Sequence, residues 1–164
     1  MSGFSNSRRD KFLAARNICS LEDKNDRLTE RCRFNFHYFT VQEAGQDFAN
    51  WNHGELIELL NHLKDYSNFS LVHWTRQPIG KSGAVLAVYG EFPKKSEFTH
   101  PTHVPHQARW GRFRLNHSKR LVGFTVPKEL DGQAHPETGL RFCSNTFYVV
   151  FLDADHKFWS SESK

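Results

Sequence analysis

The side chains best suited to chemistry lie in the second half of the chain, where several cations stand close together. Arg112 and Arg114 are separated by one residue, and Arg120 follows after a short polar stretch. His156 and Lys157 come later. Metal-independent cleavage of RNA needs a base for the ribose 2′-hydroxyl, an acid for the leaving 5′-oxygen and cations for the charge on phosphorus. These five side chains could supply all three functions if the fold brings them together.

Aromatic side chains close to these cations could hold unstacked bases during such a reaction. The candidates are Trp110, Tyr148 and Trp159. Each residue also has a purely structural interpretation. The arginines could form a solvated sheet face with surface ion pairs, His156 could cap the last strand by bonding to a neighbouring aspartate, and Trp159 could pack on the core.

A second group of titratable side chains precedes the arginines. His100, His103 and His106 lie within seven residues, and two prolines between them exclude a regular helix. The segment could bind a metal ion, supply a base or phosphate donor, or form an ordinary loop, although no carboxylate stands at a diagnostic spacing. Because it leads into Arg109, we expect His103 and His106 to lie beside any site that the arginines form. We predict no cofactor and no metal ligands.

The sequence around the arginines predicts a β-hairpin. Residues 109–116 alternate an apolar face with a cationic one, a turn follows at 116–119, and residues 120–126 alternate until Pro127. Strand alternation therefore predicts that Arg112 and Arg114 project to the same side. A polar surface loop is expected at 128–145, and the apolar run at 146–152 predicts a central strand that is buried on both faces.

The first half of the chain predicts one clear helix and several short strands. Asn52 and Glu55 have the spacing of a capping box, and leucines at 56, 59, 60 and 63 predict a helix over residues 52–66. Short strands are expected at 32–39, 71–74 and 84–89. The predicted fold class is α+β, with an antiparallel β-sheet packed against one or two N-terminal helices.

Length and composition predict a single domain. The 164 residues suit one hydrophobic core, which we place in residues 31–164, with residues 1–30 as a helical or partly disordered N-terminal arm. The net charge of +4 is compatible with a nucleic-acid partner. Three cysteines without CxxC spacing favour a reducing compartment. No apolar run is long enough for a membrane span, and we expect a cytoplasmic protein.

Residues 112–159 resemble the C-terminal half of the RelE/YoeB/ParE-like toxin superfamily. The resemblance rests on Arg112-Phe-Arg114, the strand opening at Arg120, the apolar run 145–152 and the final Asp155-His-Lys-Phe-Trp159. It implies a RelE-like fold, phosphate-binding and charge-stabilising roles for the three arginines, and acid/base and stacking roles for His156, Lys157 and Trp159. It also implies a cognate antitoxin. The length of the chain, the 128–145 insertion and the N-terminal arm depart from the usual pattern.

The leading hypothesis is a RelE-like toxin, a metal-independent endoribonuclease that acts on mRNA, in some family members on the ribosome, and is controlled by a partner protein. One alternative is a non-catalytic RNA-binding or protein-interaction module of a mobile element or defence system. Another is a His-ligated metal hydrolase. The predicted catalytic residues are Arg114, Arg120, His156 and Lys157. The predicted RNA-binding residues are His103, His106, Trp110, Arg112, Tyr148 and Trp159.

Overall fold

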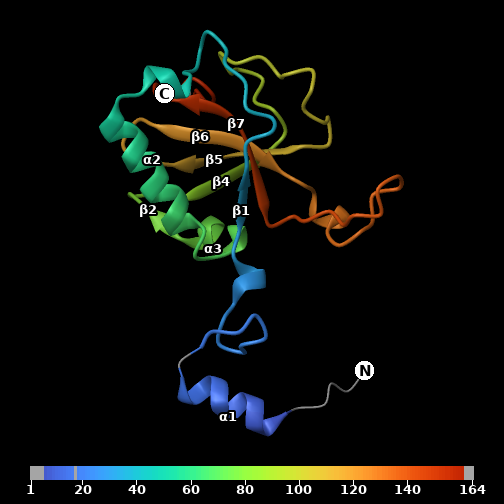
Figure 1. Ribbon diagram of the computed structural model, residues 1–164. Coiled ribbons are helices and arrows are strands. Elements are labelled where there is room, and N and C mark those ends of the chain that lie inside the picture. The colour runs from blue at the N-terminus through green and yellow to red at the C-terminus, as the bar shows by residue number, and fades with distance from the viewer. Residues whose placement is uncertain (1–5, 17, 161–164) are drawn as a thin grey trace.

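The fold is α+β, as predicted, and it is described here from a computed structural model that covers residues 6–16 and 18–160. A five-stranded sheet has the order β1-β7-β6-β5-β4, and a separate two-stranded sheet pairs β2 with β3 (Figure 1). β1 runs parallel to β7, whereas the other pairs of the large sheet are antiparallel, so the sheet is mixed. The strands are β1 (Arg33–Asn35), β2 (Pro78–Ile79), β3 (Gly83–Ala84), β4 (Leu86–Gly90), β5 (Arg109–Arg114), β6 (Arg120–Thr125) and β7 (Thr146–Asp153).

The predicted hairpin and central strand are confirmed. β5 and β6 pair from Arg109 opposite Thr125 to Arg114 opposite Arg120. β7 lies between β6 and β1, and all but one of its residues are buried. A strand that is covered on both faces is mostly apolar, and this explains the run of Phe, Tyr, Val and Leu over residues 147–152.

The predicted helix is α2 (His53–Tyr66), and its capping box is present. The Asn52 side chain accepts from the Glu55 N–H, and the Glu55 carboxylate accepts from the Asn52 N–H. Leu59 is buried, but Leu60, predicted to share the buried stripe, is 64% exposed. The buried apolar face of α2 is therefore narrower than predicted.

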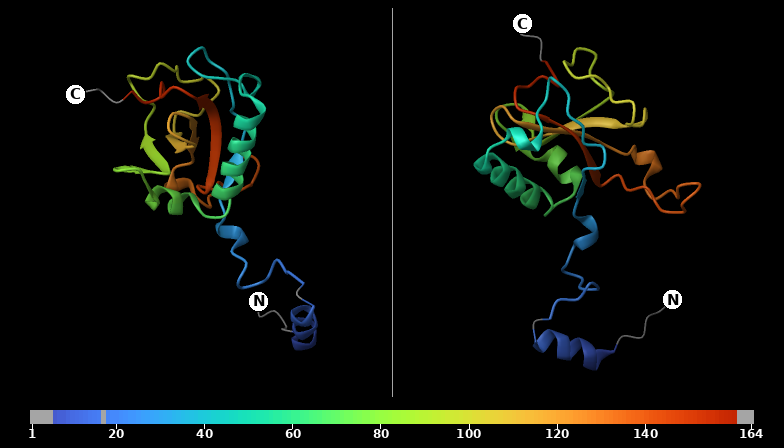
Figure 2. Two further views of the ribbon diagram at one scale, coloured as in Figure 1. Left: turned by 90° about the vertical axis from the view of Figure 1, so that its left-hand side faces the viewer. Right: turned by 45° about the horizontal axis from the view of Figure 1, so that its top comes forward.

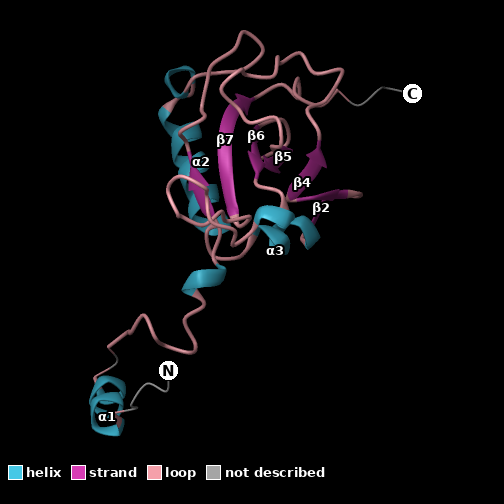
Figure 3. Ribbon diagram, turned by 90° about the vertical axis from the view of Figure 1, so that its right-hand side faces the viewer, coloured by secondary structure: helices cyan, strands magenta, loops and turns pink. Residues whose placement is uncertain are grey.

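The strand predicted at 71–74 is wrong, because this segment forms α3 (Leu71–Arg76). Ser70 begins the helix, and its hydroxyl accepts a hydrogen bond from the His73 N–H. Figure 3 shows α3 beside β4, near the small β2-β3 sheet. The strand predicted at 32–39 is also shorter than expected, since β1 ends at Asn35 and the chain then turns.

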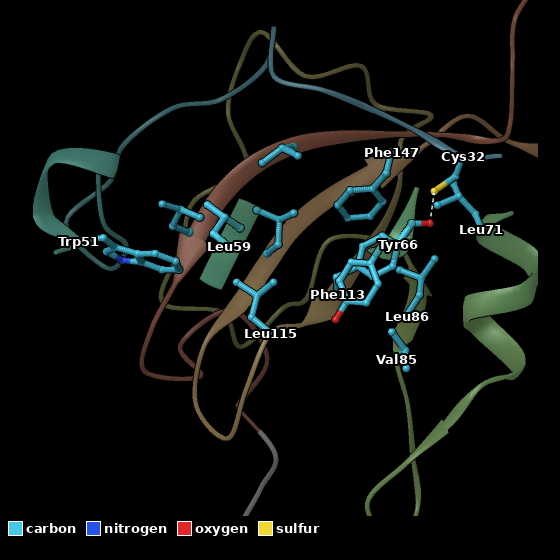
Figure 4. Packing of buried hydrophobic residues seen from close by; sticks show 13 residues of the cluster. Cys32, Trp51, Leu59, Tyr66, Leu71, Val85, Leu86, Phe113, Leu115 and Phe147 are labelled. Atoms are coloured by element: carbon cyan, nitrogen blue, oxygen red, sulfur yellow. Dashed lines mark hydrogen bonds between the residues drawn. The ribbon is translucent and has the colours of Figure 1, made fainter. Parts of the chain in front are cut away.

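Two apolar clusters cover the two faces of the large sheet. The helix-side cluster includes Leu59, Tyr66, Phe113 and Phe147, and lies between the sheet and α2 (Figures 2 and 4). On the other face, a second cluster gathers aromatic residues from the strands and from the flanking loops. Its largest buried members are Phe98, Trp110, Phe124, Phe151 and Phe158.

The remaining segments lie outside the sheet. The N-terminal arm holds α1 (Ser7–Ala15) and a short 3₁₀ turn at Leu28–Glu30, and it extends away from the sheet (Figure 1). None of the residues of α1 is buried. The 128–145 loop begins with a 3₁₀ turn at Lys128–Leu130, and an isolated bridge joins Ala134 to Arg141. A third 3₁₀ turn spans Phe48–Asn50.

Candidate functional site

The hairpin places three arginines on one face of the sheet. Arg114 lies opposite Arg120 in the β5-β6 register, and Arg112 lies two residues before Arg114. Phe113, between them, is fully buried in the helix-side cluster. Because successive side chains of a strand point to opposite faces, the arginines project to the face away from α2. We call Arg112, Arg114 and Arg120 the arginine cluster.

Arg120 is the most enclosed member, with 3% of its surface exposed. Its guanidinium donates to the carbonyl oxygens of Asn116 at 2.7 Å, Lys119 at 2.8 Å and His117 at 3.2 Å. It therefore holds the hairpin turn closed. Burial, followed by the positive charges of Arg112 and Arg114, lowers the pKa of Arg120 to about 10, which still leaves it charged at neutral pH.

The arginine cluster has more cationic donors than acceptors. In the part of the chain that the structure describes, no carboxylate forms an ion pair with any of the three guanidinium groups. Nη1 of Arg112 and Nε of Arg120 are buried without a hydrogen-bond partner. Arg112 and Arg114 are partly exposed, so an anion bound at this face could accept from their accessible N–H groups, and a phosphate offers several oxygens to do so.

Asp153 lies opposite Arg120 in the β6-β7 register and is 1% exposed. Its carboxylate accepts backbone hydrogen bonds from Asp155 at 3.2 Å, Lys157 at 3.0 Å and Phe158 at 2.9 Å. The aspartate thus fixes the turn that follows β7. It does not neutralise the arginine cluster by direct pairing.

That turn brings His156 to the arginine cluster. Nε2 of His156 lies 2.9 Å from Nη2 of Arg120 and 3.0 Å from the carbonyl oxygen of His117. A ring nitrogen can accept from the arginine only when it carries no proton, and can donate to the carbonyl only when it does. The two contacts therefore favour opposite protonation states of Nε2.

His156 is also the only non-glycine residue with a positive φ in the described part of the chain, at 59°. An L-residue pays a steric cost in this conformation, and such strain is common at functional sites. The side chain is exposed. The imidazole is therefore accessible from solvent while one of its nitrogens faces Arg120.

The sequence did not indicate Tyr89, which completes this face. Its hydroxyl accepts a hydrogen bond from Nε of Arg112 at 2.6 Å, and its ring stacks on Trp159 at 4.2 Å with an interplanar angle of 9°. Burial raises the pKa of Tyr89, so the hydroxyl keeps its proton at neutral pH. Trp159 remains 45% exposed.

Three predicted residues are directed elsewhere. Lys157 lies with its Nζ 4.0 Å from the Glu97 carboxylate, so a catalytic place beside Arg120 is not supported. The prediction that Trp110 stacks on RNA is wrong, because this residue is 1% exposed and belongs to the second apolar cluster. The ring of Tyr148 stacks on the ring of Phe124, with 5.0 Å between their centroids, and burial raises the pKa of the Tyr148 hydroxyl.

The histidines before β5 do not join the arginine cluster. His103 contacts the Tyr38 carbonyl oxygen at 3.2 Å, His100 contacts the Pro101 carbonyl oxygen at 2.9 Å, and His106 is exposed. Within residues 6–16 and 18–160, no group of three or more His, Cys, Asp or Glu side chains could hold a metal ion. The predicted position of His103 and His106 beside the site is therefore not supported.

Comparison with known proteins gave no match to a family model, to a curated protein or to a solved structure. The resemblance to RelE-like toxins stays a prediction. Among the described residues, no helix combines the length and the apolar character that crossing a membrane requires.

Proposed function

We propose that this protein is a RelE-like, metal-independent endoribonuclease that acts on mRNA and is controlled by a partner protein. The observation that supports the proposal most is the convergence of Arg112, Arg114 and Arg120 with His156 on one sheet face. Within residues 6–16 and 18–160, none of the three arginines forms an ion pair with a carboxylate. Several cations around one exposed imidazole are suited to a phosphodiester.

The reaction in this proposal is an internal transesterification of RNA. The ribose 2′-oxygen forms a bond to the adjacent phosphorus, the bond from phosphorus to the 5′-oxygen breaks, and the products end in a 2′,3′-cyclic phosphate and a 5′-hydroxyl. A base takes the 2′-hydroxyl proton, and an acid returns a proton to the 5′-oxygen. The arginine cluster stabilises the additional negative charge on the phosphorane oxygens.

His156 is the proposed base. When a phosphate oxygen accepts from Nη2 of Arg120, this donor no longer faces Nε2, which lies 2.9 Å away. The nitrogen is then free to take a proton from the 2′-hydroxyl. Tyr89 is the proposed acid, because its hydroxyl is protonated, accepts from Arg112 at 2.6 Å and can direct its own proton to the leaving oxygen.

Trp159 is the proposed stacking surface for a neighbouring base. Its ring is held parallel to Tyr89 and is 45% exposed, so one aromatic surface lies next to the phosphate-binding arginines. Stacking on such a surface tolerates any base and contributes about 1–3 kcal/mol. The site would therefore bind unpaired RNA with little sequence preference.

The test is cleavage of end-labelled mRNA by the purified chain in the presence of EDTA, with and without ribosomes. Cleavage that leaves a 2′,3′-cyclic phosphate is expected, together with growth arrest when the chain is expressed. Arg114→Gln and His156→Gln should each lower the cleavage rate by about 100-fold or more. The matched control is Arg33→Gln, which removes the same charge from β1, across the sheet from β4.

Two other outcomes would contradict the proposal. RNA binding that weakens steeply with salt, without any cleavage, would make the chain a non-catalytic binding module. Cleavage that EDTA abolishes would point to a metal hydrolase, a reading that the arrangement of potential ligands in the described residues does not favour.

A further inference from the structure

A groove lies on the helix-bearing face of the sheet, over β4 and the adjoining ends of β5 and β6. It has a volume of about 360 Å³ and is lined by residues of α3, β4 and the start of the 128–145 loop. Its floor includes Val72 from α3 and Leu86 and Val88 from β4. The arginine cluster projects from the other face, so the two sites are separate.

The floor of the groove exposes apolar surface. Val72 is 41% exposed and Val88 is 37% exposed, and both lie beside the buried Leu86. β4 is the last strand of the large sheet, so its outer edge has no strand partner there. Exposed apolar residues along a sheet edge are typical of a surface that binds another protein.

The rim of the groove is positively charged. Arg76, Arg109 and Lys128 line it, and Glu129 is the one acidic residue among the lining side chains. None of these four forms an ion pair within residues 6–16 and 18–160. An apolar floor with a cationic rim is complementary to an apolar side chain that is flanked by carboxylates.

The lining favours a protein over RNA. No aromatic residue lines the groove, so it offers no surface on which a base could stack. The hollow beside Tyr89 and Trp159, in contrast, contains several aromatic rings. We therefore expect unpaired RNA in the hollow beside Tyr89 and Trp159, and a peptide segment in the groove beside α3 and β4.

We infer that this groove binds an acidic, amphipathic segment of a partner protein. One or two apolar side chains of that segment occupy the floor, and its Asp or Glu side chains pair with Arg76, Arg109 and Lys128. The inference specifies the partner of the proposed function. It does not depend on RNA cleavage, and an occupant of the groove leaves the arginine cluster open.

The probe is a random 12-residue peptide library displayed on phage and panned against the full chain. Sequences that combine Leu, Ile or Phe with two or more acidic residues should be enriched. A synthetic peptide of the enriched class should bind with a Kd in the micromolar range, about 10-fold weaker for Val88→Glu and for Arg109→Glu. Arg114→Gln, which alters the opposite face, should bind the peptide as the parent chain does.

Three results would overturn the inference: no enrichment, enrichment of basic or uncharged sequences, or an acidic peptide that binds both groove variants as tightly as the parent. Displacement of the bound peptide by single-stranded RNA, with RNA affinity lost in Arg109→Glu, would assign the groove to RNA. Thermal unfolding of each variant shows whether it is folded. Val72→Ser provides a milder change of the same floor if Val88→Glu unfolds the chain.

Discussion

On the face of the sheet that carries α2, Phe113, Leu121 and Val149 are fully buried against one another and against the helix. On the opposite face, the neighbouring positions hold three arginines, and two of their nitrogens are buried without a hydrogen-bond partner. Burial of apolar surface stabilises the fold, whereas an unsatisfied buried donor costs free energy. The comparison teaches that both faces hold the fold together through an apolar cluster, and that the second face in addition carries a charged end whose donors are not all satisfied.

The largest expected effect comes from removing a ring on the helix-side face. Phe113→Ala should lower the free energy of unfolding by about 3–5 kcal/mol, because the cavity cannot be filled by its rigid neighbours. Chemical denaturation monitored by tryptophan fluorescence measures the change. The control is Leu60→Ala, which removes a side chain that is 64% exposed and should change stability by less than about 0.5 kcal/mol.

A substitution on the arginine-bearing face should raise the free energy of unfolding instead of lowering it. Arg112→Met removes a nitrogen that is buried without a partner, at the cost of one hydrogen bond to Tyr89. We expect the free energy of unfolding to rise by about 1 kcal/mol, while affinity for RNA falls. A loss of stability measured by the same denaturation would show that Arg112 is structural and would remove the contrast between the faces.

The conformation of His156 gives a third, smaller difference. His156→Gly and His156→Ala both remove the imidazole, but only glycine adopts a φ of 59° without steric cost. The glycine variant should therefore be about 1 kcal/mol more stable than the alanine variant. Equal melting temperatures of the glycine and alanine variants would mean that the turn changes its conformation in the alanine variant. The hydrogen bonds to Asp153 would then not be enough to keep residue 156 at a positive φ.

The smallest effect concerns the start of α2. Hydrogen bonds from Lys119 and from the Asn52 N–H lower the pKa of Glu55. The ionised carboxylate therefore stabilises the folded protein above the ordinary pKa of a glutamate, and this stabilisation is lost as the pH falls through the lowered pKa. Glu55→Gln should destabilise the protein slightly at neutral pH and hardly at all in acid. Thermal unfolding at both pH values, with Glu137→Gln as the exposed control, measures this difference.

Local patterns predicted the elements that depend on near neighbours. The Asn52 and Glu55 pair marked the start of α2, and alternation along 109–126 placed the arginines on one face. The segment at 71–74 was predicted as a strand because Leu, Val and Trp all suit strands. In the structure the segment is helical, and the Ser70 side chain caps the start of the helix. Four residues are too few for periodicity to separate the two structures.

Residues whose position depends on a bulge or a tight turn could not be predicted. The β4-β5 register shifts between Val88 and Gly90, so the direction of Tyr89 does not follow from alternation. Lys157 leaves the arginine cluster because the turn held by Asp153 directs it to Glu97. Trp110 was expected to be accessible, but the 91–108 segment contributes Phe92 and Phe98 to the cluster that covers it.

The parallel pairing of β1 with β7 has a consequence for the order in which this protein matures on the ribosome. β7 sits between β1 and β6, and it is the last strand of the described chain to be synthesised. The nascent β5-β6 hairpin therefore lacks its central neighbour until residues 146–153 have been synthesised. Pairings between segments so distant in sequence form slowly. Any activity that needs the turn after β7 is thus withheld until residues 153–158 have been synthesised and β7 has paired.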